Sequence, residues 1–263
     1  MSKLSLYRPY LLDRSFLTIY LIKHERLKIK LAGSDLNLLH KHLGMDVVFL
    51  GMNEAGEEVL SWLRDKDDVQ VKAVINERGG LPRIKEIEPE LVISSGFEHI
   101  IPKEIIEVPE KGIVNLHPSY LPYNRGAHPY IWPIIDDTVA GVSVHFMDED
   151  LDTGPLIARE EVEVRPDDDA KSLRDRLMDE QFELFKESWN SILEEKSWEQ
   201  RPELGTSHRK KDLDQKSQLE LDEEMGLGEF LDLLRGLTYG DEGLASFVKD
   251  GKRFSVKIDV SEE

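Results

Sequence analysis

The strongest constraint on the fold of this chain is an alternation of short apolar runs and amphipathic stretches that begins at Met45. Residues 45–51 read Met-Asp-Val-Val-Phe-Leu-Gly, the pattern of a buried strand, and a helix-like stretch follows over 54–64. Further strand-like runs lie at 69–75, 91–94, 113–116, 142–147 and 156–164. Because strands that alternate with helices usually form a mainly parallel sheet covered by helices, the sequence predicts a doubly wound α/β fold.

A long amphipathic helix is predicted after this series of strands. One of Asp167 to Asp169 is expected to cap it. Its apolar stripe repeats about every 3.6 residues and consists of Leu173, Leu177, Leu184, Phe185, Ile192 and Leu193. The tail has a second helical run over 227–237 and two strand-like runs around Asp250-Gly251, a two-residue hairpin signal. We therefore expect a small C-terminal segment made of a helix and a β-hairpin.

The composition of the chain changes near Gly44. Residues 1–44 contain eight Lys or Arg against three Asp or Glu, whereas the whole chain has 34 basic and 53 acidic residues. This shift predicts a basic N-terminal extension over 1–44, a main α/β domain over 45–205 and the helix and hairpin segment over 206–263. The role of the extension, and whether the native chain starts at Met45, are left open.

Several classes of protein are disfavoured by composition. The chain contains no cysteine, which excludes disulfides and thiolate metal sites and makes a reducing, cytoplasmic location the natural expectation. No apolar run approaches the roughly 18 residues of a membrane helix, and no metal-ligand spacing is visible. We therefore expect no membrane association and no metal. The formal net charge of -19 repels phosphate backbones, so we also expect no nucleic-acid partner.

The most informative segment runs from Val114 to Pro122. Side chains alternate along a strand, so Asn115 and His117 are expected on one side of it. Pro118 cannot continue the hydrogen-bonded ladder, which places this pair at the carboxyl end of a strand, where open α/β sheets bind ligands. Taken alone, such a pair is more often a structural hydrogen-bonding feature than a catalytic one.

A second candidate lies in the turn Leu151-Asp-Thr-Gly154, which follows the strand-like run ending at Met147. In isolation, Asp152 and Gly154 read as ordinary turn residues. The combination of segments changes that interpretation. In order and spacing, Asn115-Leu-His-Pro-Ser-Tyr-Leu-Pro, Asn124-Arg-Gly, Gly141-Val-Ser-Val-His-Phe-Met and Leu151-Asp-Thr-Gly resemble the signature of the formyltetrahydrofolate-dependent formyltransferases. The resemblance covers residues 45 to about 205.

The resemblance implies a Rossmann-like catalytic domain that transfers a formyl group from 10-formyltetrahydrofolate to a primary amine. Such a transfer needs donors for a developing oxyanion and a route for the proton that leaves the amine. Asn115 and His117 would be the donors, and Asp152 would favour the charged form of His117 and pass protons through water. Each such donor is worth roughly 2.7 to 4 kcal/mol in comparable acyl transfers.

By the same resemblance the pterin ring of the folate would lie in an apolar slot, held largely by backbone groups. The residues predicted to form this slot are Ser95, Gly96, Phe97, Ile100, Ile101, Pro102, Asp148, Leu151 and Gly154. On sequence alone Phe97, Ile100 and Ile101 fit a core better than a binding site. The residues predicted to contact the amine substrate are Gly51, Asn53, Tyr120, Arg125 and Gly126.

The tail and the loop around Tyr123-Asn-Arg-Gly126 resemble the branch of the family that formylates nucleotide-linked amino sugars, in which the C-terminal segment commonly helps to form a dimer. We therefore expect a nucleotide sugar as acceptor and a homodimer. Three alternatives remain open: methionyl-tRNA formylation, disfavoured by charge and tail length; formyltetrahydrofolate hydrolysis; and a folate or nucleotide-sugar binding module without turnover. The sugar, the nucleotide and the position of the amine are not specified by the sequence.

Overall fold

The computed structural model describes residues 44–51 and 53–263, and residues 45–263 form one compact unit. Apart from Gly44, the predicted basic extension lies outside the described residues. The unit is built on a six-stranded sheet of order β2-β1-β3-β4-β6-β7. The strands are β1 (Met45–Leu50), β2 (Val69–Ile75), β3 (Leu91–Ser95), β4 (Ile113–His117), β6 (Gly141–Phe146) and β7 (Leu156–Glu161).

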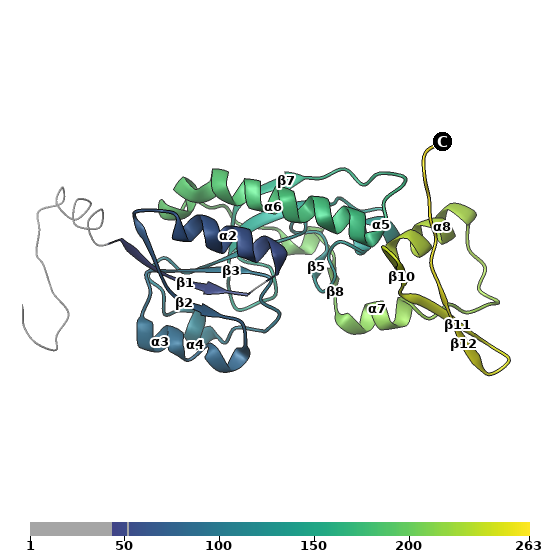
Figure 1. The fold of residues 1–263 in the computed structure, drawn as a ribbon, viewed down its shortest axis with the longest axis horizontal. Helices are drawn as coiled ribbons and strands as arrows, with labels where there is room; N and C mark the ends of the chain where they lie inside the picture. Colours follow the sequence, from purple (N-terminus) through teal and green to yellow (C-terminus); the bar gives the residue numbers. More distant parts are fainter. Residues whose placement is uncertain (1–43, 52) are drawn as a thin grey trace, which may run out of the picture. The chain divides into compact units, whose positions relative to one another are not determined.

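The first four of these strands pair in parallel, and β6 and β7 pair antiparallel. Helices α2 (Glu54–Arg64) and α6 (Ala170–Leu193) lie on one side of the sheet, and α3 (Arg83–Ile87) and α4 (Lys103–Ile106) lie on the other (Figure 1). Alternate residues of β1 enter the two cores, because successive side chains point to opposite faces. Val47 and Phe49 pack on the first side, and Val48 and Leu50 on the second. The predicted α/β fold is confirmed.

The start of the long helix α6 follows from local hydrogen bonding. Asp169 is its N-cap and accepts a hydrogen bond from the backbone N–H of Ser172 at 2.7 Å, while the Ser172 hydroxyl contacts the backbone N–H of Asp169. This reciprocal pair satisfies two N–H groups that the first helical turn leaves free. The sequence predicts one of Asp167 to Asp169 as the cap, and in the structure the cap is Asp169. Of the predicted apolar stripe, all residues are buried except Leu193, which is partly exposed.

One strand is shorter than its sequence pattern suggests. The apolar alternation continues to Val164, but β7 ends at Glu161. Glu161 pairs with Gly141, which is the first residue of the neighbouring strand β6. Beyond Gly141 the partner strand has ended. The Val162 N–H still donates to the Ala140 carbonyl oxygen at 3.0 Å, but the strand stops before the apolar pattern does.

The C-terminal part contains α7 (Lys210–Lys216), α8 (Leu227–Gly236) and the hairpin of β11 (Ala245–Lys249) and β12 (Lys252–Val256). The hairpin turn is formed by Asp250 and Gly251, both with positive φ, as predicted. The shorter elements are η1 (Arg78–Gly80), β5 (Arg125–Gly126), α5 (Trp132–Ile135), η2 (Pro202–Leu204), β8 (Ser207–His208), β9 (Thr238–Tyr239) and β10 (Glu242–Gly243). Among the helices of the described residues, none has the length and apolar character needed to cross a membrane.

Candidate active site

Strand β4 ends in two buried polar side chains. Val114 and Leu116 pack into the core under α2 and α6. Asn115 and His117 alternate with them and therefore lie on the opposite face of the sheet, where they are 9% and 7% exposed. Pro118 follows directly. The structure thus brings the predicted pair together at the carboxyl end of a strand near the middle of the sheet.

The amide of Asn115 contacts a histidine on the next strand. In the antiparallel pairing of β4 and β6, Asn115 lies opposite His145, and Asn115 Nδ2 is 3.3 Å from His145 Nε2. His145 Nδ1 is 2.8 Å from the carbonyl oxygen of Phe146, which only an N–H can satisfy. Burial lowers the pKa of His145 despite the nearby Asp152 carboxylate. A neutral ring with its proton on Nδ1 accepts from Asn115, and the second amide N–H of Asn115 stays available.

Asp152 joins this cluster from the loop between β6 and β7. Its Oδ2 is 3.6 Å from His117 Nε2, and its Oδ1 is 3.8 Å from His145 Nε2. The backbone N–H of Gly126 donates to Oδ2 at 2.9 Å, and Gln200 donates to the backbone oxygen of Asp152 at 3.2 Å. The side chain is 11% exposed. One segment of the chain therefore holds the carboxylate, and a second holds the backbone of the loop that carries it.

One atom of the cluster lacks a partner. His117 Nε2 is buried and makes no hydrogen bond within the described part of the chain. Buried polar atoms are nearly always hydrogen-bonded, so an unpartnered one at a strand tip is consistent with a place for a ligand oxygen. Two N–H donors, from Asn115 and His117, and a carboxylate beside them can stabilise negative charge on a carbonyl oxygen and accept a proton nearby.

The segment after β3 carries six of the residues predicted to hold a cofactor. Ser95 is fully buried and its hydroxyl contacts the Gln181 amide at 3.3 Å, while Gly96 has a φ of +72° and turns the chain outward. Phe97 and Ile101 pack against the core on the α4 side, and Pro102 is the residue before α4. Ile100 projects into solvent with 80% of its surface exposed. The two ends of this loop are therefore buried, whereas the side chain of Ile100 in its middle is exposed and apolar.

The loop after β6 carries the other three. Asp148 accepts from Asp150 N and from the Thr153 hydroxyl, which closes a tight turn. Leu151 is 57% exposed. Gly154 approaches the neighbouring strand so closely that a Cβ there would lie 2.0 Å from the Phe146 carbonyl oxygen, so only glycine fits.

The predicted amine-binding residues lie in three places. A Cβ on Gly51 would be 2.1 Å from the Ser95 carbonyl oxygen, so this residue permits close approach of two loops. Asn53 caps α2 by accepting from Gly56 N at 2.7 Å, which engages its side-chain oxygen. The ring of Tyr120 lies under the Arg159 guanidinium, 4.3 Å from ring centroid to Cζ. Arg125 and Gly126 form β5, next to the Asp152 loop.

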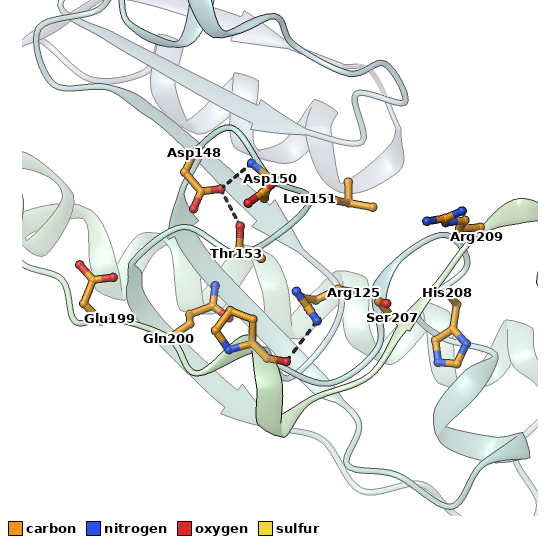
Figure 2. A pocket seen from close by; sticks show the side chains of 11 residues that line it. Arg125, Asp148, Asp150, Leu151, Thr153, Glu199, Gln200, Ser207, His208 and Arg209 are labelled. Carbon is orange, nitrogen blue, oxygen red and sulfur yellow. Dashed lines mark hydrogen bonds between the residues drawn. The ribbon is translucent and has the colours of Figure 1, made fainter.

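Beside that loop lies a cavity of about 600 Å³ (Figure 2). Its walls come from Arg125, from the loop 148–153 and from the segment 199–209. The catalytic candidates Asn115, His117 and Asp152 do not line it.

Sequence reasoning missed the residues that orient the cluster. Nothing in the local sequence around His145 distinguishes it from an ordinary strand residue, and its contact with Asn115 spans 30 positions. Gln200 likewise reaches back 48 positions to the Asp152 loop. A paired-strand alignment of 113–117 with 141–146 would have found His145, but Gln200 has no sequence signal.

Two parts of the chain match known protein families. Residues 61–188 match the formyl transferase family, and residues 212–262 match the N-formyltransferase dimerization C-terminal domain. A dTDP-4-amino-4,6-dideoxyglucose formyltransferase from Mycobacterium tuberculosis is 35% identical over 178 residues, which are 66% of this chain and 74% of that protein. A methionyl-tRNA formyltransferase from Caldanaerobacter subterraneus is 35% identical over 49% of this chain and 42% of that protein.

Two crystal structures have a similar fold. A candidate sugar N-formyltransferase from Mycobacterium tuberculosis has a TM-score of 0.74 and 29% identity over 83% of this chain and 99% of its own. The formyltransferase PseJ from Anoxybacillus kamchatkensis, in complex with UDP-4,6-dideoxy-4-formamido-L-AltNAc and tetrahydrofolate, has a TM-score of 0.55 and 28% identity over 65% of this chain and 88% of its own. Taken with the buried Asn115, His117 and Asp152 cluster, these matches establish that the chain belongs to the formyltransferase family.

Proposed function

We propose that this enzyme transfers the formyl group of 10-formyltetrahydrofolate to the primary amine of a nucleotide-linked amino sugar, with Asn115, His117 and Asp152 as catalytic residues. The observation that carries the proposal is the buried, unpartnered Nε2 of His117 beside the Asp152 carboxylate and the Asn115 amide. Two findings support a nucleotide-linked amino sugar as the acceptor. The match to this chain covers 74% of the Mycobacterium tuberculosis relative, which is named a dTDP-4-amino-4,6-dideoxyglucose formyltransferase, and PseJ was crystallised with a formylated UDP-linked sugar.

The residues present fit a folate. The exposed apolar side chains of Ile100 and Leu151 can pack against a flat ring. Backbone groups of the loops after β3 and β6 can hydrogen-bond to the polar edge of that ring. We propose that Ser95, Gly96, Phe97, Ile100, Ile101, Pro102, Asp148, Leu151 and Gly154 form this site. When bound, the folate supplies a formyl group whose carbonyl oxygen gains negative charge as an amine attacks its carbon.

In this proposal Asn115 and His117 donate hydrogen bonds to that oxygen. Asn115 does so with the amide N–H that His145 leaves free, and His117 with its protonated Nε2. Asp152 lies beside the His117 ring, takes up the proton of the attacking amine directly or through water, and can return it to the folate nitrogen that leaves as its bond to the formyl carbon breaks. The N–H of Gly126 keeps its carboxylate in place throughout. Gly51, Asn53 and Tyr120 are proposed on the side where the amine enters.

Charge and composition bear on the partner. The net charge of -19 disfavours a tRNA substrate, whose phosphates would be repelled. A chain without cysteine suits a reducing compartment, and we propose that the enzyme acts in the cytoplasm. Two functional parts are proposed within the described unit, the catalytic domain over 45–205 and the C-terminal segment over 206–263.

The decisive test is incubation with 10-formyltetrahydrofolate and a panel of dTDP- and UDP-linked amino sugars, followed by product mass. A gain of one formyl group on one member of the panel is expected. Parallel reactions contain methionyl-tRNA or no acceptor. Formylation of the tRNA alone would show a tRNA formyltransferase, and release of formate alone would show a hydrolase. Folate binding without turnover in any reaction would identify a binding module.

We predict that His145 acts by positioning Asn115. In His145→Phe an aromatic ring remains at this position, but the acceptor for the Asn115 amide is lost, so the amide can rotate away from the substrate oxygen. The turnover number should fall about ten- to a hundred-fold while the KM values change little, as for other residues that orient catalytic groups. Steady-state kinetics check this, with thermal unfolding to verify the fold. A variant whose KM rises while turnover is unchanged would contradict the positioning role.

We also propose that the C-terminal segment forms a homodimer. Within the described residues, eight of the twelve large, exposed apolar side chains lie between 221 and 260, including Val248 at 59% and Phe254 at 45%. Such a concentration is typical of an interaction surface. The match of 212–262 to a dimerization domain supports the same conclusion.

This dimer predicts that Val248→Asp with Phe254→Asp yields a monomer, because two carboxylates would be buried without partners. Sedimentation equilibrium should give twice the 30.3 kDa chain mass for the wild type and the single chain mass for the variant. Leu204→Asp, which changes a 60% exposed leucine outside the segment, is the matched control and should stay dimeric. A monomeric wild type at micromolar concentration would contradict the proposal.

A further inference from the structure

A buried serine near the carboxyl end of β3 has a hydroxyl group that no described residue satisfies. Ser94 is fully buried, and its Oγ makes no hydrogen bond within the described part of the chain. A buried hydroxyl without a partner is costly, whereas an alanine of almost the same size would carry no such cost. The serine therefore indicates that a polar neighbour uses its hydroxyl.

Strand pairing identifies the neighbours of Ser94. In the parallel sheet it lies opposite Leu50 of β1 on one side and opposite Asn115 of β4 on the other. Residues paired in this way point to the same face, and the pair two positions earlier, Val92 and Ile113, packs into the core on the α3 and α4 side. Leu50 belongs to the same apolar core. Of the two residues that flank Ser94 across the sheet, Asn115 alone is polar.

The amide of Asn115 is held from the opposite side only. Its Nδ2 contacts His145 of β6 at 3.3 Å, and its side chain makes no other hydrogen bond with a described residue, so Oδ1 has no donor. Neighbouring strands lie about 4.8 Å apart. At this spacing a serine hydroxyl reaches the amide of the paired asparagine after a rotation about one side-chain bond. Ser94, Asn115 and His145 thus form one row across three strands, with the amide in the middle.

We propose that Ser94 is a positioning residue for Asn115, whose Oδ1 accepts a hydrogen bond from the Ser94 hydroxyl while Nδ2 donates to His145. Because the Nδ1 proton of His145 is engaged by a backbone oxygen, its Nε2 only accepts and determines which end of the amide faces β6. Ser94 adds a second fixed point. The plane of the amide then cannot swing, and its free N–H keeps its direction toward the formyl oxygen. The role of this contact in turnover, though not the contact itself, rests on the proposed function.

The first test is steady-state kinetics of Ser94→Ala in the full chain, with 10-formyltetrahydrofolate and the acceptor that the panel identifies. The turnover number should fall about three- to ten-fold, the factor that one neutral hydrogen bond contributes, while both KM values stay unchanged. The matched control is Ser188→Ala, which also removes a buried hydroxyl, one that donates to the Leu184 carbonyl oxygen within α6 at 2.6 Å. This control should turn over like the wild type, and circular dichroism checks the fold of both variants.

A double variant separates positioning from a merely structural role. If Ser94 acts through the amide, Ser94→Ala should lower turnover no further once Asn115→Ala has removed that amide. A further three- to ten-fold loss in the Asn115→Ala background would overturn the proposal. So would normal turnover of Ser94→Ala, or a rise in the KM for the folate alone, since the hydroxyl would then contact the folate instead of Asn115.

The second test needs no turnover. In a chain labelled with nitrogen isotope on asparagine alone, NMR observes the side-chain amides, and the signal of Asn115 is the one that Asn115→Ala removes. Ser94→Ala should shift this signal and leave those of the other asparagines in place, and Ser188→Ala should shift none of them.

The two tests keep the contact and the reaction apart. An unchanged Asn115 signal in Ser94→Ala would overturn the proposal even if the enzyme transfers formyl groups. A shifted signal in a chain that formylates no acceptor would support the contact and remove only the proposed reaction.

Discussion

Replacing His117 by alanine is expected to lower the turnover number about 10²- to 10³-fold, the usual cost of losing one oxyanion donor. The ring has Asp152 at 3.6 Å from its Nε2 and no other partner for that atom among the described residues. Its removal therefore deletes a donor to the substrate without breaking a hydrogen bond of the folded chain. Turnover at saturating folate and amino sugar measures the effect, and circular dichroism checks that the sheet is intact.

A double variant tests whether His117 and Asp152 act as one unit. Asp152→Asn alone should also lower turnover strongly, because the amide cannot take up a proton. If the two side chains cooperate, the double variant should be little worse than the poorer single variant. Near-normal turnover of a folded His117→Ala would remove this residue from the mechanism, and fully multiplicative losses would show that the two residues act independently.

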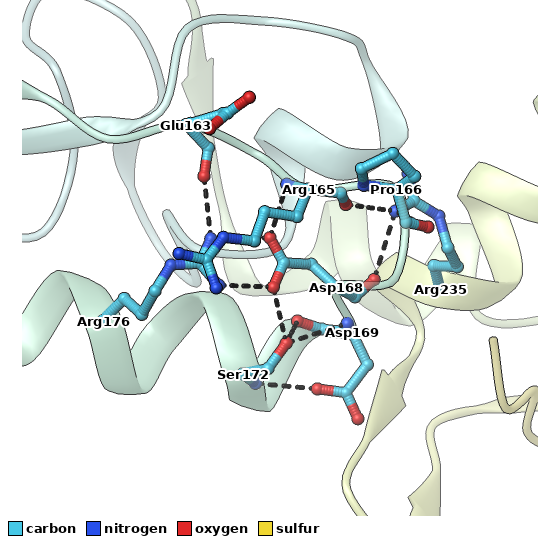
Figure 3. Close-up of polar contacts among 8 residues, drawn as sticks. All are labelled: Glu163, Arg165, Pro166, Asp168, Asp169, Ser172, Arg176 and Arg235. Atoms are coloured by element: carbon cyan, nitrogen blue, oxygen red, sulfur yellow. Dashed lines mark hydrogen bonds and ion pairs between the residues drawn. The ribbon is translucent and has the colours of Figure 1, made fainter. Parts of the chain in front are cut away.

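The largest expected effect on stability is that of Asp168→Ala, at about 1.5–3 kcal/mol of unfolding free energy, because it removes charge-assisted hydrogen bonds to a buried carboxylate and leaves the partly exposed Arg176 guanidinium without its ion-pair partner. Asp168 is 2% exposed and binds Arg176 in a two-pronged ion pair of 2.6 and 2.7 Å (Figure 3). It also accepts from Arg165 N and the Ser172 hydroxyl. Its own backbone oxygen, with those of Arg165 and Pro166, receives the Arg235 guanidinium of α8.

Urea unfolding followed by fluorescence would measure the loss. The matched control is Asp175→Ala, which removes a carboxylate from the exposed pair with Lys171 on the same helix. Exposed pairs contribute little, so this control should unfold almost like the wild type. Similar midpoints for Asp168→Ala and the wild type would show that the buried pair is dispensable.

The same pair predicts a pH dependence. Burial alone would raise the pKa of Asp168, but hydrogen bonds from Arg176, Arg165 N and Ser172 outweigh it, so the pKa lies below the ordinary 3.8. A carboxyl whose pKa is lower in the folded chain stabilises the fold above its unfolded pKa, and this contribution is lost as the pH falls through the folded value. The difference in unfolding free energy between the wild type and Asp168→Ala should therefore be full at pH 7 and shrink below about pH 4. A difference that does not change with pH would contradict this account.

Local sequence determined the elements of this protein. The apolar run of 45–51, the helix over 54–64, a cap among Asp167 to Asp169 and the turn at Asp250-Gly251 depend on residues within a few positions of one another, so pattern and turn chemistry suffice to predict them. The placement of Asn115 and His117 on one face follows in the same way, since alternation along a strand is a local property.

Only the tertiary structure decided how the site is supported. His145 reaches Asn115 because β6 lies beside β4 in one register, and Gly126 and Gln200 reach the Asp152 loop across 26 and 48 positions of sequence. The end of β7 at Glu161 and the cavity around Arg125 likewise depend on where partner segments begin and end. Such contacts depend on strand pairing and on how distant segments pack together. The sequence around one residue therefore does not reveal its partner far along the chain.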